Sequence, residues 1–339
     1  MKIVFFDLED WEIDYFKKRI LNQEVEYYKT EIEDTLYDSA FDAELISSFV
    51  FSKLDKKTLD KFKNLKFIAT MSTGFDHIDL TECEKRKIKV CNVPSYGENT
   101  VAEHTFGLIL SLSRNIYKAY QVTSKGKFSY EGLMGFDLKG KTIGILGTGK
   151  IGQNVIKIAK GFNMNVIAYD PHPKEDVRTT LGFTYVSFNE LLATSDIVSI
   201  HVPLNSHTYH LFNTDSMQKM KTGAMLINTS RGPIVDTNAL LEALNTKKLG
   251  SAGLDVLEGE MLMKEEKAVV SQNSQMAREQ MATLLEDYAL MRMNNVIITP
   301  HLAFYSKEAV TRILDSTLDN LFDFIENRNL RNKVEIKPD

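Results

Sequence analysis

The stretch TIGILGTGKIGQNVIKIAKGFNMNVIAYD, residues 142–170, decides the fold of this chain. It joins a β-rich run to a helix-patterned segment through glycines in GxGxxG spacing, and the next β-rich run ends at Asp170. Gly147 permits a tight turn, Gly149 lets the backbone approach a pyrophosphate, and Gly152 lets the helix pack closely on the strand. The pyrophosphate then lies on the helix N-terminus. The pattern therefore predicts a strand-turn-helix-strand unit that binds a dinucleotide.

The acidic residue at the end of this unit selects between the two nicotinamide dinucleotides. Asp170 would accept hydrogen bonds from the adenosine ribose hydroxyls and repel a 2′-phosphate, which favours NAD over NADP. Thr148, Lys150 and Ile151, which stand between the glycines, are expected to contact the same cofactor. A plain structural glycine turn is the alternative, but strand, helix and acidic residue in register favour dinucleotide binding.

The same alternation of β-rich and helix-patterned segments extends in both directions from this unit. Polar, helix-patterned stretches such as residues 59–65 and 80–87 separate the β-rich runs. The runs are KIVFFDL, EVEYYK, AELISSFVF, KFIATMS and KVCNV in the first ninety residues, and TIGILG, NVIAYD, DIVSIHV, AMLINTS, SAGLDV and VIITP after Lys141. Such a rhythm predicts the α/β class, with doubly wound, mostly parallel sheets covered by helices on both faces.

The length of the chain, 339 residues, predicts two domains, because one ordinary core does not grow so large. Residues 98–126 keep apolar positions at helical spacing without proline, and we expect one long helix there. The amphipathic segment 306–328 is expected to pack back on the first domain. The predicted domains are a discontinuous, flavodoxin-like substrate-binding domain, residues 1–98 and 305–339, and a Rossmann NAD-binding domain, residues 99–304.

Composition and charge exclude several other classes of protein. With 43% hydrophobic and 26% charged residues the chain is globular. Its net charge of -5 and the lack of a long Lys/Arg cluster disfavour nucleic acid and anionic membrane as partners. The start, MKIVFFDLED, is typical of a first strand and not of a signal peptide. Cys83 and Cys91 form no CxxC pair, so we expect a reducing, cytoplasmic location.

Three polar segments follow predicted strands, where ligands gather in open α/β sheets. They supply Arg231 in NTSRGPIVD, several carboxylates in GLDVLEGE, and His301 in TPHLAF. Each alone could be a surface ion pair, a solvated acidic loop or a core histidine. Together they suit carbonyl reduction: a guanidinium grips a carboxylate, an imidazole transfers a proton, and a carboxylate behind the imidazole stabilises its charged form. These groups supply the electrophilic assistance, so no metal is expected.

These motifs resemble the D-isomer-specific 2-hydroxyacid dehydrogenase family, and within it the D-lactate dehydrogenase-like branch. The similar segments run in order through nearly the whole chain: STGFDHIDL, NVPSYGENTVAEHTFGLIL, GILGTGKIG, YDPHP, HVPL, INTSRGPIVD, GLDVLEGE and NVIITPHLAFYS. The resemblance implies that Arg231, Glu260 and His301 are the catalytic residues. It also implies a two-domain fold with the active site in the cleft, and usually a homodimer formed through the nucleotide-binding domains.

The resemblance further implies which residues bind substrate and cofactor. Backbone N–H groups of Thr73 and Gly74 would hold the substrate carboxylate, and Tyr96 would line the substrate pocket beside Arg231 and His301. A plain turn and a hinge tyrosine are the alternatives. For His201 the alternative is a strand-end histidine with a structural bond. The residues implied to contact the cofactor are Asp255, which would face the nicotinamide amide, His201, Val202, Pro203, Thr229 and Ser230.

Part of the acidic stretch departs from the family pattern. Met261 stands where many relatives have proline, and the methionine-rich segment 261–295 is long. We expect an extra helical pair there, or alternatively a cover over the cleft or an oligomer contact. Glu258, Glu265 and Glu266 are expected to be solvated surface acids.

The function expected from the resemblance is that of a NAD-dependent D-2-hydroxyacid dehydrogenase acting on pyruvate or a similar short 2-keto acid. A glyoxylate or hydroxypyruvate reductase would share every catalytic residue. A 3-phosphoglycerate dehydrogenase-like enzyme is less favoured, because the regulatory module that many of those enzymes carry does not follow Asp339. A NAD-binding, corepressor-like sensor is the alternative from another class.

Overall fold

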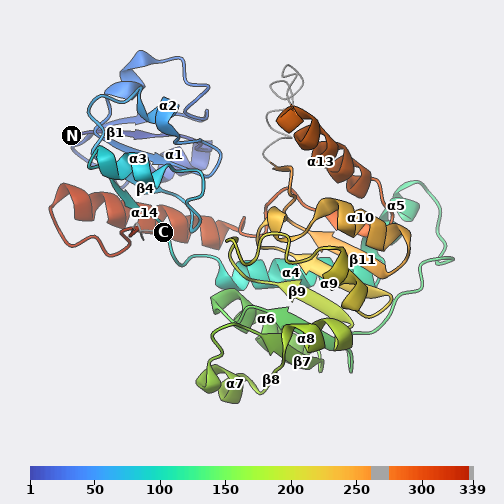
Figure 1. The fold of residues 1–339 in the computed structure, drawn as a ribbon. Helices are drawn as coiled ribbons and strands as arrows, with labels where there is room; N and C mark the ends of the chain where they lie inside the picture. The colour runs from blue at the N-terminus through green and yellow to red at the C-terminus, as the bar shows by residue number, and fades with distance from the viewer. Residues whose placement is uncertain (261–274, 336–339) are drawn as a thin grey trace. The chain divides into compact units, whose positions relative to one another are not determined.

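The fold was analysed in a computed structural model, which describes residues 1–260 and 275–335. The chain divides into two compact units. Unit 1 comprises Met1–Tyr96 and Ser306–Asp339, and unit 2 comprises Gly97–Tyr305. Each unit is built on its own parallel sheet (Figure 1).

Unit 1 contains a five-stranded sheet in the order β2-β1-β3-β4-β5, and all of its strand pairs are parallel. Its strands are β1 (Lys2–Phe5), β2 (Glu24–Tyr27), β3 (Leu45–Ser48), β4 (Phe67–Thr70) and β5 (Lys89–Cys91). Its helices are α1 (Asp10–Lys17), the 3-10 helix η1 (Asp38–Asp42), α2 (Lys56–Leu59), α3 (Leu80–Lys85) and α14 (Lys307–Ile325). The last helix packs on β4, where the rings of Phe67 and Phe324 stack 4.5 Å apart. This strand order is that of flavodoxin-like domains.

Unit 2 contains a seven-stranded sheet in the order β12-β11-β10-β9-β6-β7-β8, again parallel throughout. Its strands are β6 (Thr142–Leu146), β7 (Asn165–Tyr169), β8 (Thr184–Tyr185), β9 (Ile197–Ile200), β10 (Ala224–Asn228), β11 (Leu249–Leu254) and β12 (Val296–Ile298). The chain winds outward from β6 in one direction and from β9 in the other, so a topological switch point lies between them. The predicted α/β class with two doubly wound parallel sheets is confirmed.

Helices cover both faces of the unit 2 sheet. One face carries α4 (Glu98–Ser113) and α6 (Lys150–Gly161), and the other carries α8 (Phe188–Thr194), α9 (Thr214–Lys219) and α10 (Thr237–Asn245). A short helix, α7 (Glu175–Leu181), packs on α6. Two apolar clusters, one on each face, enclose the interior strand β10, whose five residues AMLIN are all buried. A strand buried on both faces must be apolar throughout, as this one nearly is.

The predicted long helix over residues 98–126 is wrong, because the chain forms two helices, α4 and α5 (Ile116–Ser124). Between them Asn115 adopts a left-handed backbone conformation with φ 50°. Asparagine tolerates this conformation better than most residues. Its side-chain amide donates to the carbonyl of Met134 at 3.0 Å, and Phe136 N donates to Ser113 O at 2.8 Å. The returning chain therefore supplies the bonds that end α4.

The methionine-rich segment is only partly described, since residues 261–274 lie outside the described residues. Its second part forms α13 (Gln275–Met291), which packs on α10 and β12. Glu265 and Glu266, predicted as surface acids, fall outside as well. Among the helices that the structure describes, each is too short or too polar to cross a membrane.

Candidate active site

The predicted catalytic and cofactor residues of unit 2 follow neighbouring strands. The glycine loop follows β6, His201 follows β9, Arg231 follows β10, the acidic stretch follows β11 and His301 follows β12. Because these strands are adjacent and parallel, their carboxyl ends lie at one edge of the sheet, where open α/β sheets bind ligands.

The glycine loop between β6 and α6 has the geometry of a pyrophosphate site. Gly147 has φ 92°, and a Cβ there would meet His201 O at 2.6 Å. A Cβ at Gly152 would meet Gly147 O at 2.1 Å. No described atom, however, lies within 4 Å of a Cβ built on Gly149, the N-cap residue of α6. Gly147 and Gly152 must be glycine because a side chain there would collide with the protein backbone. Gly149, in contrast, leaves the approach to the helix N-terminus open for a ligand.

Asp170, at the end of β7, is fixed beside this loop. Its Oδ2 accepts from Thr148 N at 2.8 Å and Thr148 Oγ1 at 2.9 Å, and its Oδ1 accepts from His172 N at 2.9 Å. Burial alone would raise the pKa of Asp170, but these hydrogen bonds lower it, so the carboxylate is ionised. An ionised, oriented carboxylate suits ribose hydroxyls and repels a 2′-phosphate, so these residues fit NAD.

The segment after β9 contacts both the glycine loop and the loop that carries Arg231. Ser230 Oγ donates to Val202 O, and the His201 ring is bonded to Ser199 Oγ at 2.8 Å. Desolvation lowers the pKa of His201 to about 3, so this imidazole is neutral. A neutral, internally bonded imidazole is a structural group, and its predicted contact with the cofactor stays a prediction.

His301 and Glu260 form a hydrogen-bonded pair. His301 Nδ1 lies 2.7 Å from Glu260 Oε1, and both side chains are partly exposed. A carboxylate on Nδ1 fixes the tautomer of the ring and stabilises its protonated form. The arrangement leaves Nε2 as the ring nitrogen that can exchange a proton with a ligand.

Asp255 holds the loop that carries His301. His301 has φ 52°, a left-handed conformation that a residue other than glycine adopts at some cost. Its backbone N–H donates to Asp255 O at 2.8 Å. The buried Asp255 carboxylate accepts from Thr299 Oγ1 at 2.5 Å, Leu302 N at 3.0 Å and Ala303 N at 2.9 Å. Asp255 is therefore an anchor for the loop of His301, and its predicted contact with the nicotinamide stays a prediction.

Arg231 begins the 3-10 helix η2 (Gly232–Ile234) after β10. The Asn228 side chain fixes the turn before it, since Nδ2 donates to Arg231 O at 2.9 Å and Oδ1 accepts from Ser230 N at 3.0 Å. A Cβ at Gly232 would stand 2.0 Å from Leu257 O. The glycine after Arg231 thus lets its loop lie directly against the segment that leads to Glu260.

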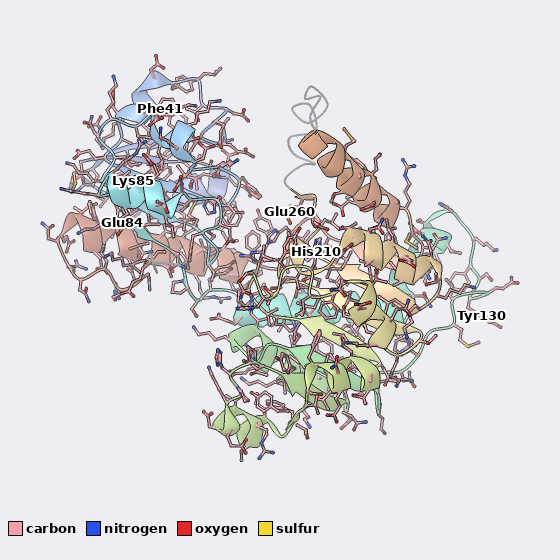
Figure 2. All side chains as sticks on the ribbon, viewed as in Figure 1. Phe41, Glu84, Lys85, Tyr130, His210 and Glu260 are labelled. Carbon is pink, nitrogen blue, oxygen red and sulfur yellow. The ribbon has the colours of Figure 1, made fainter. Side chains whose placement is uncertain are left out.

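The prediction for Glu258 is wrong, because this side chain is not a solvated acid. It is only 16% exposed, and its Oε1 lies 2.5 Å from Nε2 of His210, which is labelled in Figure 2. Its Oε2 accepts from Thr237 N at 3.2 Å and Thr237 Oγ1 at 3.1 Å. Sequence spacing could not reveal this, since the partners lie on segments 21 and 48 residues away.

Unit 1 contains the other predicted substrate residues. Thr73 Oγ1 donates to Val93 O at 2.7 Å, and Thr73 O accepts from Asn92 Nδ2 at 2.8 Å. Gly74 O accepts from Ser72 Oγ at 2.6 Å. These contacts use the side chain and carbonyl groups of the turn and none of the backbone N–H groups of Thr73 and Gly74. Binding of a substrate carboxylate by these amides stays a prediction.

Tyr96, the third predicted substrate residue of unit 1, is held by its backbone. Its carbonyl accepts from Arg312 Nε of α14 at 2.5 Å, so the last residue of the first segment of unit 1 is tied to the C-terminal helix. Its role in a substrate pocket stays a prediction.

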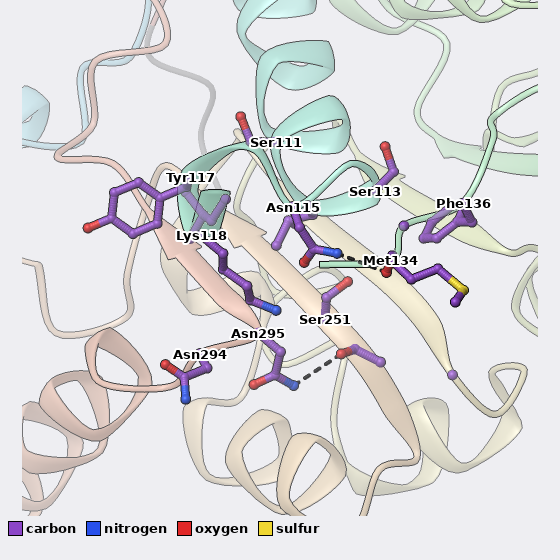
Figure 3. A pocket seen from close by; sticks show the side chains of 15 residues that line it. Ser111, Ser113, Asn115, Tyr117, Lys118, Met134, Phe136, Ser251, Asn294 and Asn295 are labelled. Atoms are coloured by element: carbon purple, nitrogen blue, oxygen red, sulfur yellow. Dashed lines mark hydrogen bonds between the residues drawn. The ribbon is translucent and has the colours of Figure 1, made fainter. Parts of the chain in front are cut away.

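A pocket lies at the opposite edge of the unit 2 sheet (Figure 3). It is bounded by Gly223, Ser251 and Asn295, which stand at the amino ends of β10, β11 and β12, and by the chain around Asn115. The predicted catalytic residues follow the carboxyl ends of the same strands. This pocket is therefore not part of the candidate active site.

Comparison with known proteins gives a consistent result over the whole chain. A family model described as D-isomer specific 2-hydroxyacid dehydrogenase, NAD binding domain, matches residues 106–303. The chain is 36% identical over 340 residues to a 2-hydroxyacid dehydrogenase homolog of Haemophilus influenzae, covering 98% of this chain and 99% of the relative. It is 34% identical over 342 residues to a D-lactate dehydrogenase of Escherichia coli, covering 98% and 100%. The crystal structure of D-lactate dehydrogenase from Aquifex aeolicus, complexed with NAD and lactic acid, is 34% identical, with a TM-score of 0.86 and coverage of 99% and 100%.

Proposed function

The chain belongs to the D-isomer specific 2-hydroxyacid dehydrogenase family, and we propose that within it the chain reduces pyruvate or a similar short 2-keto acid to the D-2-hydroxy acid. The resemblance inferred from the sequence motifs is confirmed, as are the oxidoreductase class and NAD as cofactor. The observation that carries the proposal is the 2.7 Å contact between His301 and Glu260, at the same sheet edge as Arg231 and the glycine loop.

In the proposed mechanism, each catalytic side chain acts on one part of the substrate. Bound NADH supplies the hydride that reduces the keto carbon. Arg231 grips the substrate carboxylate and polarises the neighbouring carbonyl with its planar set of N–H donors. Protonated His301 donates its Nε2 proton to the carbonyl oxygen, and Glu260 stabilises the protonated ring through Nδ1. In the oxidative direction, neutral His301 accepts the hydroxyl proton.

The proposed binding residues divide between the two units. We assign Thr73, Gly74 and Tyr96 of unit 1 to the substrate, which makes unit 1 the substrate-binding domain. The cofactor residues all belong to unit 2, the NAD-binding domain. They comprise Gly147, Thr148, Gly149, Lys150, Ile151, Gly152, Asp170, His201, Val202, Pro203, Thr229, Ser230 and Asp255.

Turnover with a panel of 2-keto acids tests the function directly. Pyruvate, glyoxylate, hydroxypyruvate and a bulky branched 2-keto acid would each be offered with NADH and with NADPH, and product chirality would be determined. We expect the highest kcat/KM for pyruvate or a similar short acid, with NADH preferred because Asp170 repels a 2′-phosphate. A higher kcat/KM for glyoxylate or hydroxypyruvate would indicate a glyoxylate or hydroxypyruvate reductase instead. Tight NADH binding without turnover would favour a NAD-binding, corepressor-like sensor.

We also propose that the chain forms a homodimer through unit 2. The segment of residues 116–136 exposes several large apolar side chains, including Phe128 at 99%, Tyr130 at 92% and Met134 at 93%. Tyr130 extends away from the body of the unit (Figure 2). Contiguous apolar exposure on this scale is typical of an interaction surface, and a second copy supplies a matching surface by symmetry.

The double substitution Phe128→Asp and Tyr130→Asp is expected to convert the dimer into a monomer. Two charges in an apolar interface must be desolvated on association, which costs more than the contacts return. The mass in solution, measured by light scattering after gel filtration, should fall by half. Tyr37→Asp, a substitution of an exposed tyrosine in unit 1, is the matched control and should leave the mass unchanged. A double variant of unchanged mass would contradict the proposal.

A cytoplasmic location remains part of the proposal. It is supported by Cys83 and Cys91, which are buried and unpaired. Burial raises the pKa of both thiols to about 12, so they behave as apolar core groups.

A further inference from the structure

A second carboxylate is buried directly behind the loop that carries Glu260. Asp287 of α13 is 0% exposed, and its Oδ2 accepts from the backbone N–H of Gly259 at 2.9 Å. A Cβ built on Gly259 would stand 2.6 Å from the same oxygen, so only glycine lets the carboxylate approach this closely. A buried carboxylate is costly, and the proposed mechanism does not use Asp287.

We propose that Asp287 is a positioning residue for the reaction: it fixes the backbone at Gly259, and through it the direction in which Glu260 reaches His301. The inference rests on the proposed function, because it gives Glu260 its part in proton transfer. It also gives α13, which lies in the methionine-rich segment expected to form an extra helical pair, a part in holding the active site.

The residue on the other side of Gly259 is held as well. Glu258 bonds to Thr237 of α10 and to His210, as described above. Thr237 Oγ1 also lies 3.5 Å from Asp287 Oδ1, so one hydroxyl connects both carboxylates. Asp287 thus holds Gly259, and Thr237 and His210 hold Glu258, so both residues that precede Glu260 are restrained. A side chain attached to so restrained a backbone has few directions open to it, which preserves the 2.7 Å contact with His301.

The charged groups around Asp287 make its restraint sensitive to pH. Burial raises the pKa of Asp287 to about 7, and the charges of Glu258 and Glu286 act in the same direction, against the hydrogen bonds from Gly259 and Thr237. On the far side of Glu258 lie His210 and Asp236. The ionised carboxylate is the stronger acceptor for Gly259 N–H, so the restraint strengthens as the pH rises through 7.

A double-mutant cycle between Asp287 and Glu260 tests the proposal. Asp287→Ala is expected to lower kcat about ten- to hundredfold, because a misplaced catalytic group loses rate steeply. NADH affinity should stay within about twofold, because the contact lies outside the cofactor loop. In a Glu260→Gln background the same substitution should change kcat less than about twofold, since the group that it positions is already gone.

Two variants serve as controls. Asp287→Asn keeps an acceptor oxygen without the charge and should recover most of kcat, with less dependence on pH between 6 and 8. Glu286→Ala removes the neighbouring carboxylate of α13, which bonds to Asn238 at 2.8 Å, and should leave kcat unchanged. If Asp287→Ala does not fold, Gly259→Ala applies the same test from the other side of the contact, because its Cβ pushes the carboxylate away.

An equal loss of kcat from Asp287→Ala in both backgrounds would overturn the proposal, as would an unchanged kcat in the single variant. A measurement that does not depend on enzyme turnover distinguishes failure of the positioning role from failure of the proposed function. The NMR shift of the proton on His301 Nδ1, which reports the hydrogen bond to Glu260, should move in Asp287→Ala toward the value found in Glu260→Gln. It should not move in Glu286→Ala. A shift of this kind in a chain that reduces no 2-keto acid would support the positioning role and refute only the substrate assignment.

Discussion

Replacement of His301 by alanine is expected to lower kcat for 2-keto acid reduction by about 10² to 10⁴, the range that a positioned general acid contributes. His301 is bonded to Glu260 through Nδ1, and it follows β12 at the same sheet edge at which Arg231 follows β10. NADH affinity should be retained, because the glycine loop and Asp170 lie on other strands. Stopped-flow reduction and NADH fluorescence titration measure the two quantities separately.

Two further variants identify the cause of this loss. His301 has φ 52°, so alanine introduces a backbone penalty besides removing the acid. His301→Asn suits this conformation better and should lose the same activity, because an amide cannot donate a proton as an acid. His207→Ala, which removes an exposed histidine of the same unit, should leave kcat unchanged. Full activity in either His301 variant would refute the assignment.

Replacement of Arg231 by glutamine is expected to lower kcat/KM by a similar factor. Two charge-assisted hydrogen bonds to the substrate are lost, worth about 3 to 5 kcal/mol together, or roughly two to four powers of ten in rate. Arg231→Lys should recover only part of the loss, because an ammonium carries the charge without the planar fork. Steady-state kinetics with a series of pyruvate concentrations gives kcat/KM for each variant.

The substrate itself provides the decisive comparison for Arg231. The wild-type enzyme should strongly prefer pyruvate over its amide, which lacks the carboxylate charge, and Arg231→Gln should lose this preference. Arg178→Gln, which breaks an exposed pair with Glu175 on α7, is the matched control and should change neither value. An Arg231 variant that still discriminates acid from amide would show that another group binds the carboxylate.

The fold and the principal site residues could be predicted because their signals are local. The GxGxxG motif places glycine where backbone segments pack too closely for a side chain. The structure shows such close packing at Gly147 and Gly152. The alternation of β-rich runs and amphipathic segments likewise reflects burial of strands on both faces of a parallel sheet. Arg231 and His301 could be proposed because each follows a predicted strand, and the structure places them after β10 and β12.

The contacts that hold these residues in place could not be predicted in the same way. Glu258 was expected to be solvated, and residues 98–126 were expected to form a single helix. In both places the decisive partners are distant in sequence: His210 and Thr237 for Glu258, and the chain at Met134 for Asn115. Composition around Glu258 is acidic and gives no sign of burial.

The sequence by itself therefore determined the α/β class, the dinucleotide loop and the family, since each is encoded in short-range spacing that steric and hydrogen-bonding rules constrain. Only the tertiary structure decided which of the acids are buried and which groups hold them. Asp255 anchors the loop of His301, and Asp287 restrains the backbone before Glu260. The carboxylates around Glu260 have the same chemistry and differ in burial and in hydrogen-bond partners. Burial and partners depend on which distant segments the fold brings together.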